Sequence, residues 1–157
     1  MIKIRVRKWQ CEGLEEKPGF TLIEIMLVVA VISVLVLLAA PNFLRSRMTS
    51  NETVALSSLK TIYSGCQLYY NNNEGYPSAG LQDLANSSPS YIDSALGSGT
   101  KQGYQFIYLF IDANHFTVNA NPVAPGRTGD RYFFIDETGV IHAATGAAAT
   151  VNDPAVS

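Results

Sequence analysis

Glu24 has the most distinctive chemistry in the chain, because it is the only ionisable residue in a long apolar stretch. Phe20 to Ala40 is 21 residues long, and Ile25 to Ala40 carries no charge. About 20 helical residues cross the apolar part of a bilayer. An ionisable side chain within such a segment costs roughly 2.5–3.5 kcal/mol on insertion scales, which usually indicates a function. The simpler alternative is that Glu24 lies near the interface and reaches water among the lipid headgroups.

The other polar residues offer weaker chemistry. His115 and His142 fall in strand-like segments without a Cys or Asp at metal-ligand spacing, so we expect both to be structural or exposed. Asp112, Asp130 and Asp136 lie in predicted turns, where their oxygen atoms could hold calcium, although turn chemistry alone accounts for them. We find no nucleophile beside a base and no paired carboxylates. The sequence therefore predicts neither an enzyme nor a bound cofactor.

Charge is distributed unevenly along the 157 residues. Residues 1–19 have a net charge of +2, and the remainder has a net charge of −4. A mildly acidic domain without a basic stripe is not typical of nucleic-acid binding, so no nucleic acid is expected as a partner. Cys11 and Cys66 lie on opposite sides of the apolar run, and any cut between them leaves Cys66 without a disulfide partner.

We expect the apolar run to be a membrane helix that is retained, not a secretory signal that is removed. A secretory signal is cut after its apolar region at small residues in an A-x-A arrangement. Ala39 and Ala40 do not fit that arrangement, and Pro41 follows them. Because the positive flank precedes the run, the N-terminus should stay in the cytoplasm while residues 42–157 are exported.

The helical pattern continues beyond Pro41, so we predict one helix from about residue 21 to about residue 73. Pro41 should bend this helix or remove one backbone hydrogen bond. The segment Asn71–Gly75 and the following Pro77 should end it. An apolar stripe at steps of three, four and seven should face a core; it consists of Ala55, Leu56, Leu59, Ile62, Tyr63, Cys66, Tyr69 and Tyr70.

The second half of the chain has the period of β-strands. After short helical turns expected at Leu81–Ala85 and Tyr91–Ala95, two hairpins are predicted. The tail from Ala144 is rich in Ala and Thr and is expected to fray. The predicted strands are Gly103–Ile111, His115–Ala120, Arg131–Ile135 and Val140–Ala143.

The run Lys17-Pro18-Gly19-Phe20-Thr21-Leu22-Ile23-Glu24 resembles the processing site of type IV pilins and type II secretion pseudopilins. The resemblance implies cleavage between Gly19 and Phe20 by a prepilin peptidase, and N-methylation of Phe20. It also implies an α+β fold of ladle shape. In that fold a long N-terminal helix, kinked near Pro41, packs its C-terminal half on an antiparallel sheet of about four strands.

The resemblance divides the chain into three parts. Residues 1–19 would be a cytoplasmic leader that is removed, residues 20–41 a transmembrane and assembly segment, and residues 42–157 a periplasmic globular domain. The leader is longer than many in the family. The mature chain also lacks the cysteine pair of the C-terminal disulfide loop in many pilins, which favours a pseudopilin or a short, disulfide-free pilin.

Two residues of the motif have a physical reason for their type. Cutting before Phe20 creates a positive amine about one helical turn from Glu24, and the carboxylate of an incoming subunit can neutralise the amine of its neighbour. In a helical core of low dielectric, such a pair would penalise wrong axial register. A side chain at Gly19 would obstruct a protease subsite; the alternative is a simple turn glycine after Pro18.

These features predict a structural subunit of a type IV pilus or a type II secretion pseudopilus. The expected location is the bacterial inner membrane as a single-pass precursor, and later a periplasmic or surface filament. The expected partners are copies of the chain and related pilins, the prepilin peptidase, an inner-membrane assembly platform, and membrane lipid before assembly. The alternative is a membrane-anchored periplasmic binding module that never polymerises.

Overall fold

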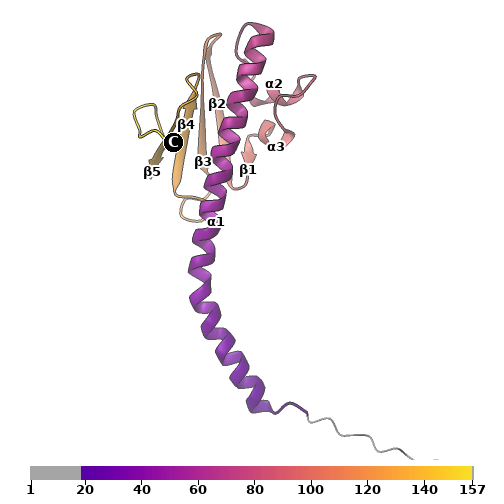
Figure 1. Cartoon of the computed structure of the whole chain (residues 1–157), viewed down its shortest axis with the longest axis vertical. Helices are drawn as coiled ribbons and strands as arrows, with labels where there is room; N and C mark the ends of the chain where they lie inside the picture. The colour runs from indigo at the N-terminus through magenta and orange to yellow at the C-terminus, as the bar shows by residue number, and fades with distance from the viewer. Residues whose placement is uncertain (1–18, 157) are drawn as a thin grey trace, which may run out of the picture. The chain divides into compact units, whose positions relative to one another are not determined.

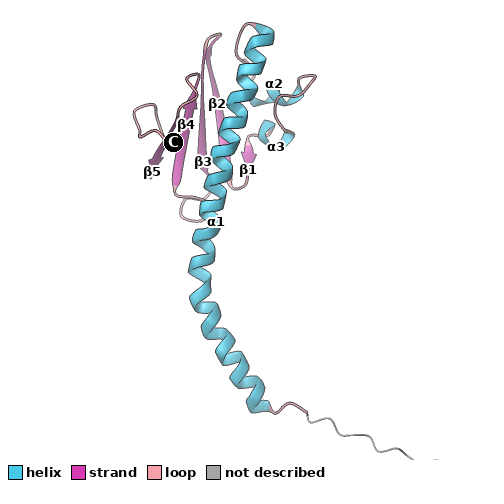
Figure 2. Ribbon diagram, in the orientation of Figure 1, coloured by secondary structure: helices cyan, strands magenta, loops and turns pink. Residues whose placement is uncertain are grey.

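The computed structural model describes residues 19–156, without the side chains of Leu38 and Ala40. The leader prediction, apart from Gly19, lies outside these residues. Figures 1 and 2 show a long helix followed by two short helices and an antiparallel sheet. The elements in chain order are α1 (Leu22–Asn73), α2 (Leu81–Asn86), α3 (Ser94–Gly97), β1 (Thr100–Lys101), β2 (Tyr104–Asp112), β3 (His115–Pro122), β4 (Arg131–Asp136) and β5 (Ile141–Thr145).

The chain forms two compact units, which divide between Leu38 and Ala39. In its described residues, the first unit consists of the short segment before α1 and the N-terminal part of that helix. The second unit contains the rest of α1 and all other elements. Pro41 lies inside α1, so the prediction of one helix through this proline is confirmed. The bend expected at Pro41 stays a prediction.

The sheet has five strands in the order β1-β2-β3-β4-β5, and every neighbouring pair is antiparallel. The four predicted strands are β2 to β5, with ends within two residues of those expected. The fifth strand, β1, was missed because it has only two residues and therefore no readable period. It pairs with Tyr104 and Gln105 at the start of β2.

The second half of α1 packs on this sheet through the predicted apolar stripe. Ala55, Leu59, Ile62 and Cys66 are buried, and they share a core cluster with aromatic residues such as Phe133. Burying a side chain of leucine or isoleucine size stabilises the folded state by roughly 1.5–3 kcal/mol. The stripe thus supplies the helix side of the core that joins the second half of α1 to the sheet.

The loop between β3 and β4 is fixed to α1 by polar contacts. The Asn51 side chain donates to the Thr128 carbonyl oxygen at 2.9 Å. Glu52 Oε1 accepts from the backbone amides of Asp130 and Arg131, at 3.0 and 3.3 Å. These bonds hold residues 123–130 beside residues 41–52 of α1, at one end of the second unit (Figure 1).

The expectation that the tail frays is wrong. Residues after β5 fold back along that strand, where the amide of Ala143 donates to the Pro154 carbonyl and the amide of Val156 donates to the Ile141 carbonyl. Asn119, on the neighbouring part of the sheet, donates from its side chain to the Ala149 carbonyl at 2.9 Å. The tail keeps a defined position because its backbone groups bond to β5, the strand before it, and to Asn119 of β3.

Candidate functional site: the amino-terminal segment of α1

The residues on either side of the predicted cut lie before the first turn of α1. Gly19 and Phe20 are both exposed, and the Phe20 side chain is 81% exposed. A methyl group built on Gly19 would meet nothing within 4 Å among the described atoms, and its backbone does not lie in the left-handed region. The fold of the described residues therefore supplies no reason for a glycine here.

Thr21 and Glu24 form a capping box at the start of α1. The backbone amide of Glu24 donates to Thr21 Oγ1 at 3.3 Å, and the backbone amide of Thr21 donates to Glu24 Oε2 at 3.5 Å. Such reciprocal contacts satisfy amides that a helix start leaves without intrahelical partners. The sequence analysis missed Thr21, although Thr-x-x-Glu before an apolar run is the known signal for this cap.

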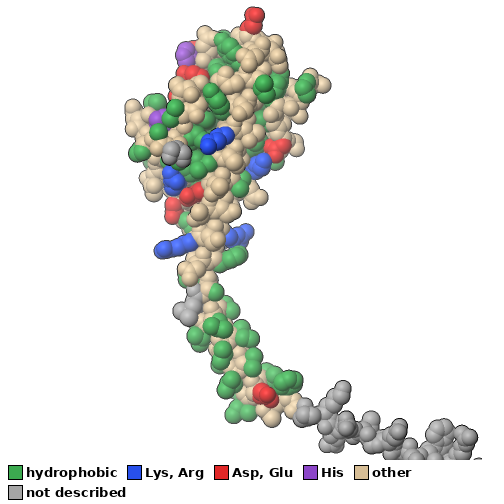
Figure 3. All heavy atoms as spheres, viewed as in Figure 1, with side chains coloured by type: hydrophobic (Ala, Val, Ile, Leu, Met, Phe, Trp, Pro, Cys, Tyr) green, Lys and Arg blue, Asp and Glu red, His purple; other side chains and the backbone are tan. Residues whose placement is uncertain are grey.

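The first part of α1 presents an apolar surface that no described residue covers. Every residue from Leu22 to Leu37 is exposed, and almost all of them are hydrophobic (Figure 3). Ser33, a polar exception, donates to the carbonyl of Val29 at 2.7 Å, so its hydroxyl is satisfied within the helix. This arrangement suits a medium without water, because each polar group of the segment can bond internally.

The length and composition of the described helices bear on the membrane-helix expectation. No single described helix is long and apolar enough to cross a membrane, whereas the segments Leu22–Leu37 and Pro41–Asn73 are when they are taken together.

The three candidate calcium ligands do not come together. Asp112 and Asp136 lie at the turns after β2 and β4, whereas Asp130 precedes β4 at its opposite end. Asp136 Oδ1 accepts from the amide and hydroxyl of Thr138, which is ordinary turn bonding. Within residues 19–156, no group of three or more His, Cys, Asp or Glu side chains could hold a metal ion.

His115 has an acidic partner that the sequence analysis did not anticipate. Its Nδ1 lies 2.9 Å from Asp112 Oδ1, across the β2–β3 turn, and its Nε2 lies 3.9 Å from Glu137. The hydrogen bond to Asp112 raises the pKa of His115. Bonds from the Asn114 amide and then from His115 lower the pKa of Asp112. Both side chains are more than half exposed, so the pair is a surface interaction of modest strength.

Cys66 is buried in the core between α1 and the sheet and is a free thiol. Burial raises its pKa to about 12, so the thiol stays protonated at neutral pH. Because the thiolate is the reactive form, Cys66 behaves here as a small apolar core residue.

An exposed apolar helix start, a capping carboxylate and a helix packed on an antiparallel sheet together define the pilin-like class of α+β proteins. Comparison with known proteins agrees. Residues 17–40 match the model of the prokaryotic N-terminal methylation motif. The chain is 33% identical over 92 residues to the type IV wide pilus major component PilA4 of Thermus thermophilus. These 92 residues are 57% of this chain and 70% of that protein.

Two further relatives show similar identity over shorter shares of their length. The type IV major pilin protein PilA of Myxococcus xanthus is 34% identical over 87 residues, which are 55% of this chain and 36% of that protein. The type II secretion system core protein G of Escherichia coli is 29% identical over 92 residues, which are 57% of this chain and 62% of that protein. This chain thus spans only about a third of the Myxococcus protein and under two thirds of the Escherichia protein.

The chain belongs to the family of type IV pilins and type II secretion pseudopilins. Because this family consists of structural subunits, the expectation that the chain is not an enzyme is confirmed.

Proposed function

We propose that this chain is made as a membrane-anchored precursor and then polymerises into a type IV pilus or a type II secretion pseudopilus. The observation that carries the proposal is the apolar surface of α1 from Leu22 to Leu37, which the chain leaves exposed beside its methylation motif. A helix with such a surface is stable in lipid or against other helices. The bilayer covers it first, and the helices of neighbouring subunits cover it in the filament.

Removal of the leader between Gly19 and Phe20 creates the positive charge that Glu24 needs. The amide of Thr21, one residue after Phe20, lies 3.5 Å from the Glu24 carboxylate. N-methylation of Phe20 keeps the charge of the amine. In the filament, Glu24 of an incoming subunit neutralises the Phe20 amine of its neighbour, and a wrong register leaves a buried charge unpaired, at a cost of about 3–5 kcal/mol.

The same proposal assigns the topology and the partners. The leader lies in the cytoplasm and residues 42–157 lie in the periplasm, with Pro41 bending the helix between the assembly segment and the domain. The partners are other copies of the chain and related pilins, the prepilin peptidase and an inner-membrane assembly platform. The relatives support this assignment, since two are pilus components and one is a secretion-system core protein.

Electron microscopy of the sheared surface fraction and of the periplasmic fraction tests this function, with the chain detected by antibody. Labelled filaments at the surface support a pilus, and short periplasmic filaments support a pseudopilus. Glu24→Ala should lower the filament yield strongly, whereas Glu74→Ala, at the exposed end of α1, should not. Monomeric membrane protein in every fraction would contradict the proposal and favour an anchored binding module.

A further inference from the structure

Four of the six Lys and Arg residues after Gly19 gather at one end of the second unit; we call Arg45, Arg47, Arg127 and Arg131 the arginine cluster. Two come from the first turns of α1 after Pro41, and two come from the β3–β4 loop and the start of β4. The bonds of Asn51 and Glu52 to that loop bring the two pairs to the same end of the domain. In Figure 3, basic side chains are visible at this end.

No guanidinium of the arginine cluster is neutralised by a salt bridge in the described part of the chain. Glu52, the nearest carboxylate on the helix, is already used as the acceptor for two backbone amides. Arg47 lies over the ring of Phe43 at 5.7 Å and Arg131 over the ring of Phe133 at 5.2 Å. The cluster therefore keeps positive charge that is available to an external anion.

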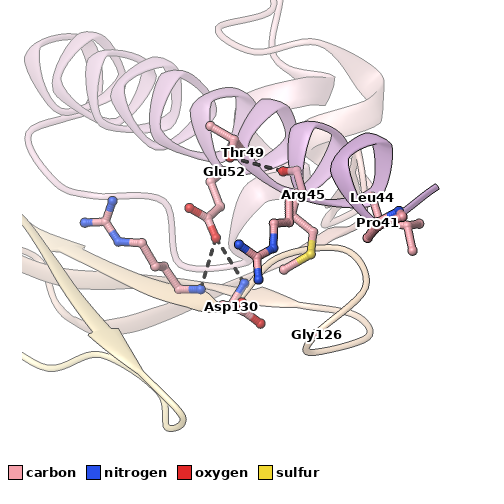
Figure 4. Close-up of a pocket in the computed structure, with 9 residues that line it drawn as sticks. Pro41, Leu44, Arg45, Thr49, Glu52, Gly126 and Asp130 are labelled. Atoms are coloured by element: carbon pink, nitrogen blue, oxygen red, sulfur yellow. Dashed lines mark hydrogen bonds between the residues drawn. The ribbon is translucent and has the colours of Figure 1, made fainter. Parts of the chain in front are cut away.

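Arg45 and Arg131 line an open hollow of about 610 Å³ between α1 and the loop (Figure 4). Its other walls include the apolar residues Pro41, Leu44 and Met48 and the carboxylates of Glu52 and Asp130, of which Glu52 is engaged by two backbone amides. A hollow with guanidinium groups on one wall and apolar side chains on another matches a molecule that carries a phosphate next to a hydrocarbon part. Arginine suits phosphate because its planar fork can donate two parallel hydrogen bonds.

The opposite end of the domain has the opposite charge. Glu74 follows α1, Asp112 lies in the β2–β3 turn, and Asp136 and Glu137 lie in the β4–β5 turn. Gly75 lies beside Ala113, which places the end of α1 next to the β2–β3 turn. An anionic surface would consequently attract the arginine cluster and repel the far end, which orients the domain.

The cluster also lies at a suitable distance from the apolar segment along the chain. Arg45 follows Ala40 by five residues, which is about 7.5 Å of helix at 1.5 Å per residue. The headgroup layer on each side of a bilayer is about 5–8 Å thick, given a total thickness of 40–45 Å around a core of about 30 Å. When the segment 20–40 spans the bilayer, Arg45 therefore lies at the outer edge of the headgroup layer, and Arg47, about 10.5 Å from Ala40, lies just beyond it.

We infer that the arginine cluster binds the phosphate groups of anionic phospholipids on the outer face of the membrane before the subunit enters a filament. The inference rests on the proposed function, because it needs the precursor to be anchored by its apolar segment. A lipid surface fits better than another copy of the chain, because the hollow combines guanidinium groups with apolar side chains and Arg45 follows the apolar segment by only five residues. Binding would hold the domain upright with its acidic end away from the membrane.

Native mass spectrometry of the full chain in detergent, with equal amounts of phosphatidylglycerol and phosphatidylcholine, tests this inference. The wild-type chain should retain phosphatidylglycerol in preference. Each basic residue near an anionic surface contributes roughly a fivefold gain in binding. Arg45→Gln with Arg131→Gln should therefore lower the preference about 25-fold. The matched control is Lys60→Gln with Lys101→Gln, which removes the same charge elsewhere and should keep the preference; the leader is the same in all variants.

Three results would overturn the inference. In the first, the wild-type chain retains both lipids equally. In the second, both double variants lose the preference equally, and in the third, the arginine variant keeps its lipid preference but assembles fewer filaments. The last result would assign the cluster to a contact between subunits. Extraction of the membrane fraction with carbonate separates this test from the proposed function. Wild-type chain that is released by carbonate contradicts the membrane anchor itself, whereas retained chain without lipid preference contradicts only the lipid site.

Discussion

Thr21 and Glu24 contact each other's backbone amides in both directions at the first turn of α1. The carboxylate that we assign to subunit register is therefore engaged inside its own chain before any neighbour arrives. Both bonds are long, at 3.3 and 3.5 Å, so the cap is weak enough for a stronger partner to replace it. A positive amine is such a partner, because it adds the attraction between two full charges, which a neutral backbone amide does not offer to the carboxylate.

Separate variants should distinguish the cap from the ion pair. Thr21→Val removes the hydroxyl acceptor, which costs about 1 kcal/mol of helix stability, but it keeps the carboxylate. Glu24→Gln keeps an acceptor for the cap but removes the charge. We expect Thr21→Val to assemble nearly as the wild type does, and Glu24→Gln to be processed normally but to yield filaments about tenfold less. Immunoblots of sheared filaments and of the processed membrane pool measure both quantities. Equal filament yield from Glu24→Gln and the wild type would show that assembly does not need the negative charge of Glu24.

Gly19→Leu should block processing without disturbing the fold. The space around Gly19 is open in the described structure, so a larger side chain meets no neighbour there. We expect the precursor to accumulate at its full mass while the denaturation midpoint of the domain stays unchanged. Gly126→Ala is a useful contrast, because that glycine has a φ of +78° and should affect stability but not processing. Mature-size protein from Gly19→Leu would show that the glycine is only a turn residue.

Two leucines of α1 should differ sharply in their effect on stability. Leu59 is fully buried against the sheet, whereas Leu68 is 54% exposed on the same helix. Leu59→Ala should lower the free energy of unfolding by about 2–5 kcal/mol, through lost burial and a residual cavity. Leu68→Ala should change it by about 0.5 kcal/mol or less. Chemical denaturation of the detergent-solubilised chain, followed by circular dichroism, compares them. Similar losses for both variants would contradict the assigned face of the helix.

The pair of Asp112 and His115 should titrate as a unit. Its bond raises the pKa of His115 above the ordinary 6.5 and lowers the pKa of Asp112 below the ordinary 3.8. The stabilising contribution of His115 is therefore complete below pH 6.5 and is lost as pH rises through its raised pKa. That of Asp112 is complete above about pH 4 and is lost as pH falls through its lowered pKa. Because both groups are exposed, the effect on stability should be small, and NMR titration of the imidazole is the better measurement. Asp112→Asn should bring the His115 pKa back down, and an unchanged value would rule out the contact.

The sequence predicted those parts of the fold that depend on local pattern. The stripe through Leu59 and Ile62 specifies one helix face, and the alternation in β2 to β5 specifies the sheet, because side-chain period reports secondary structure directly. It failed where partners are distant in sequence. Asn119 holds the tail at Ala149, and only the folded sheet brings these residues together.

The candidate site divides in the same way. The motif around Gly19 and Glu24 is a local pattern and could be read from the residues alone. The Thr21 cap is also local, but a glutamate beside an apolar run equally indicates a charge in a membrane helix, and this second pattern hides the cap. By contrast, the arginine cluster consists of residues from α1, the β3–β4 loop and the start of β4. Charge counted along the sequence therefore gives no sign of it.

A chain that is cut after Gly19 and assembles through the helix that follows has a defined N-terminus in the filament. Mass spectrometry of the N-terminal peptide from purified filaments measures it. We expect a peptide that begins at Phe20 and carries a methyl group on its amine, with no peptide from residues 1–19 in the filament fraction. A chain that keeps its leader and is found only as monomer in the membrane would contradict it.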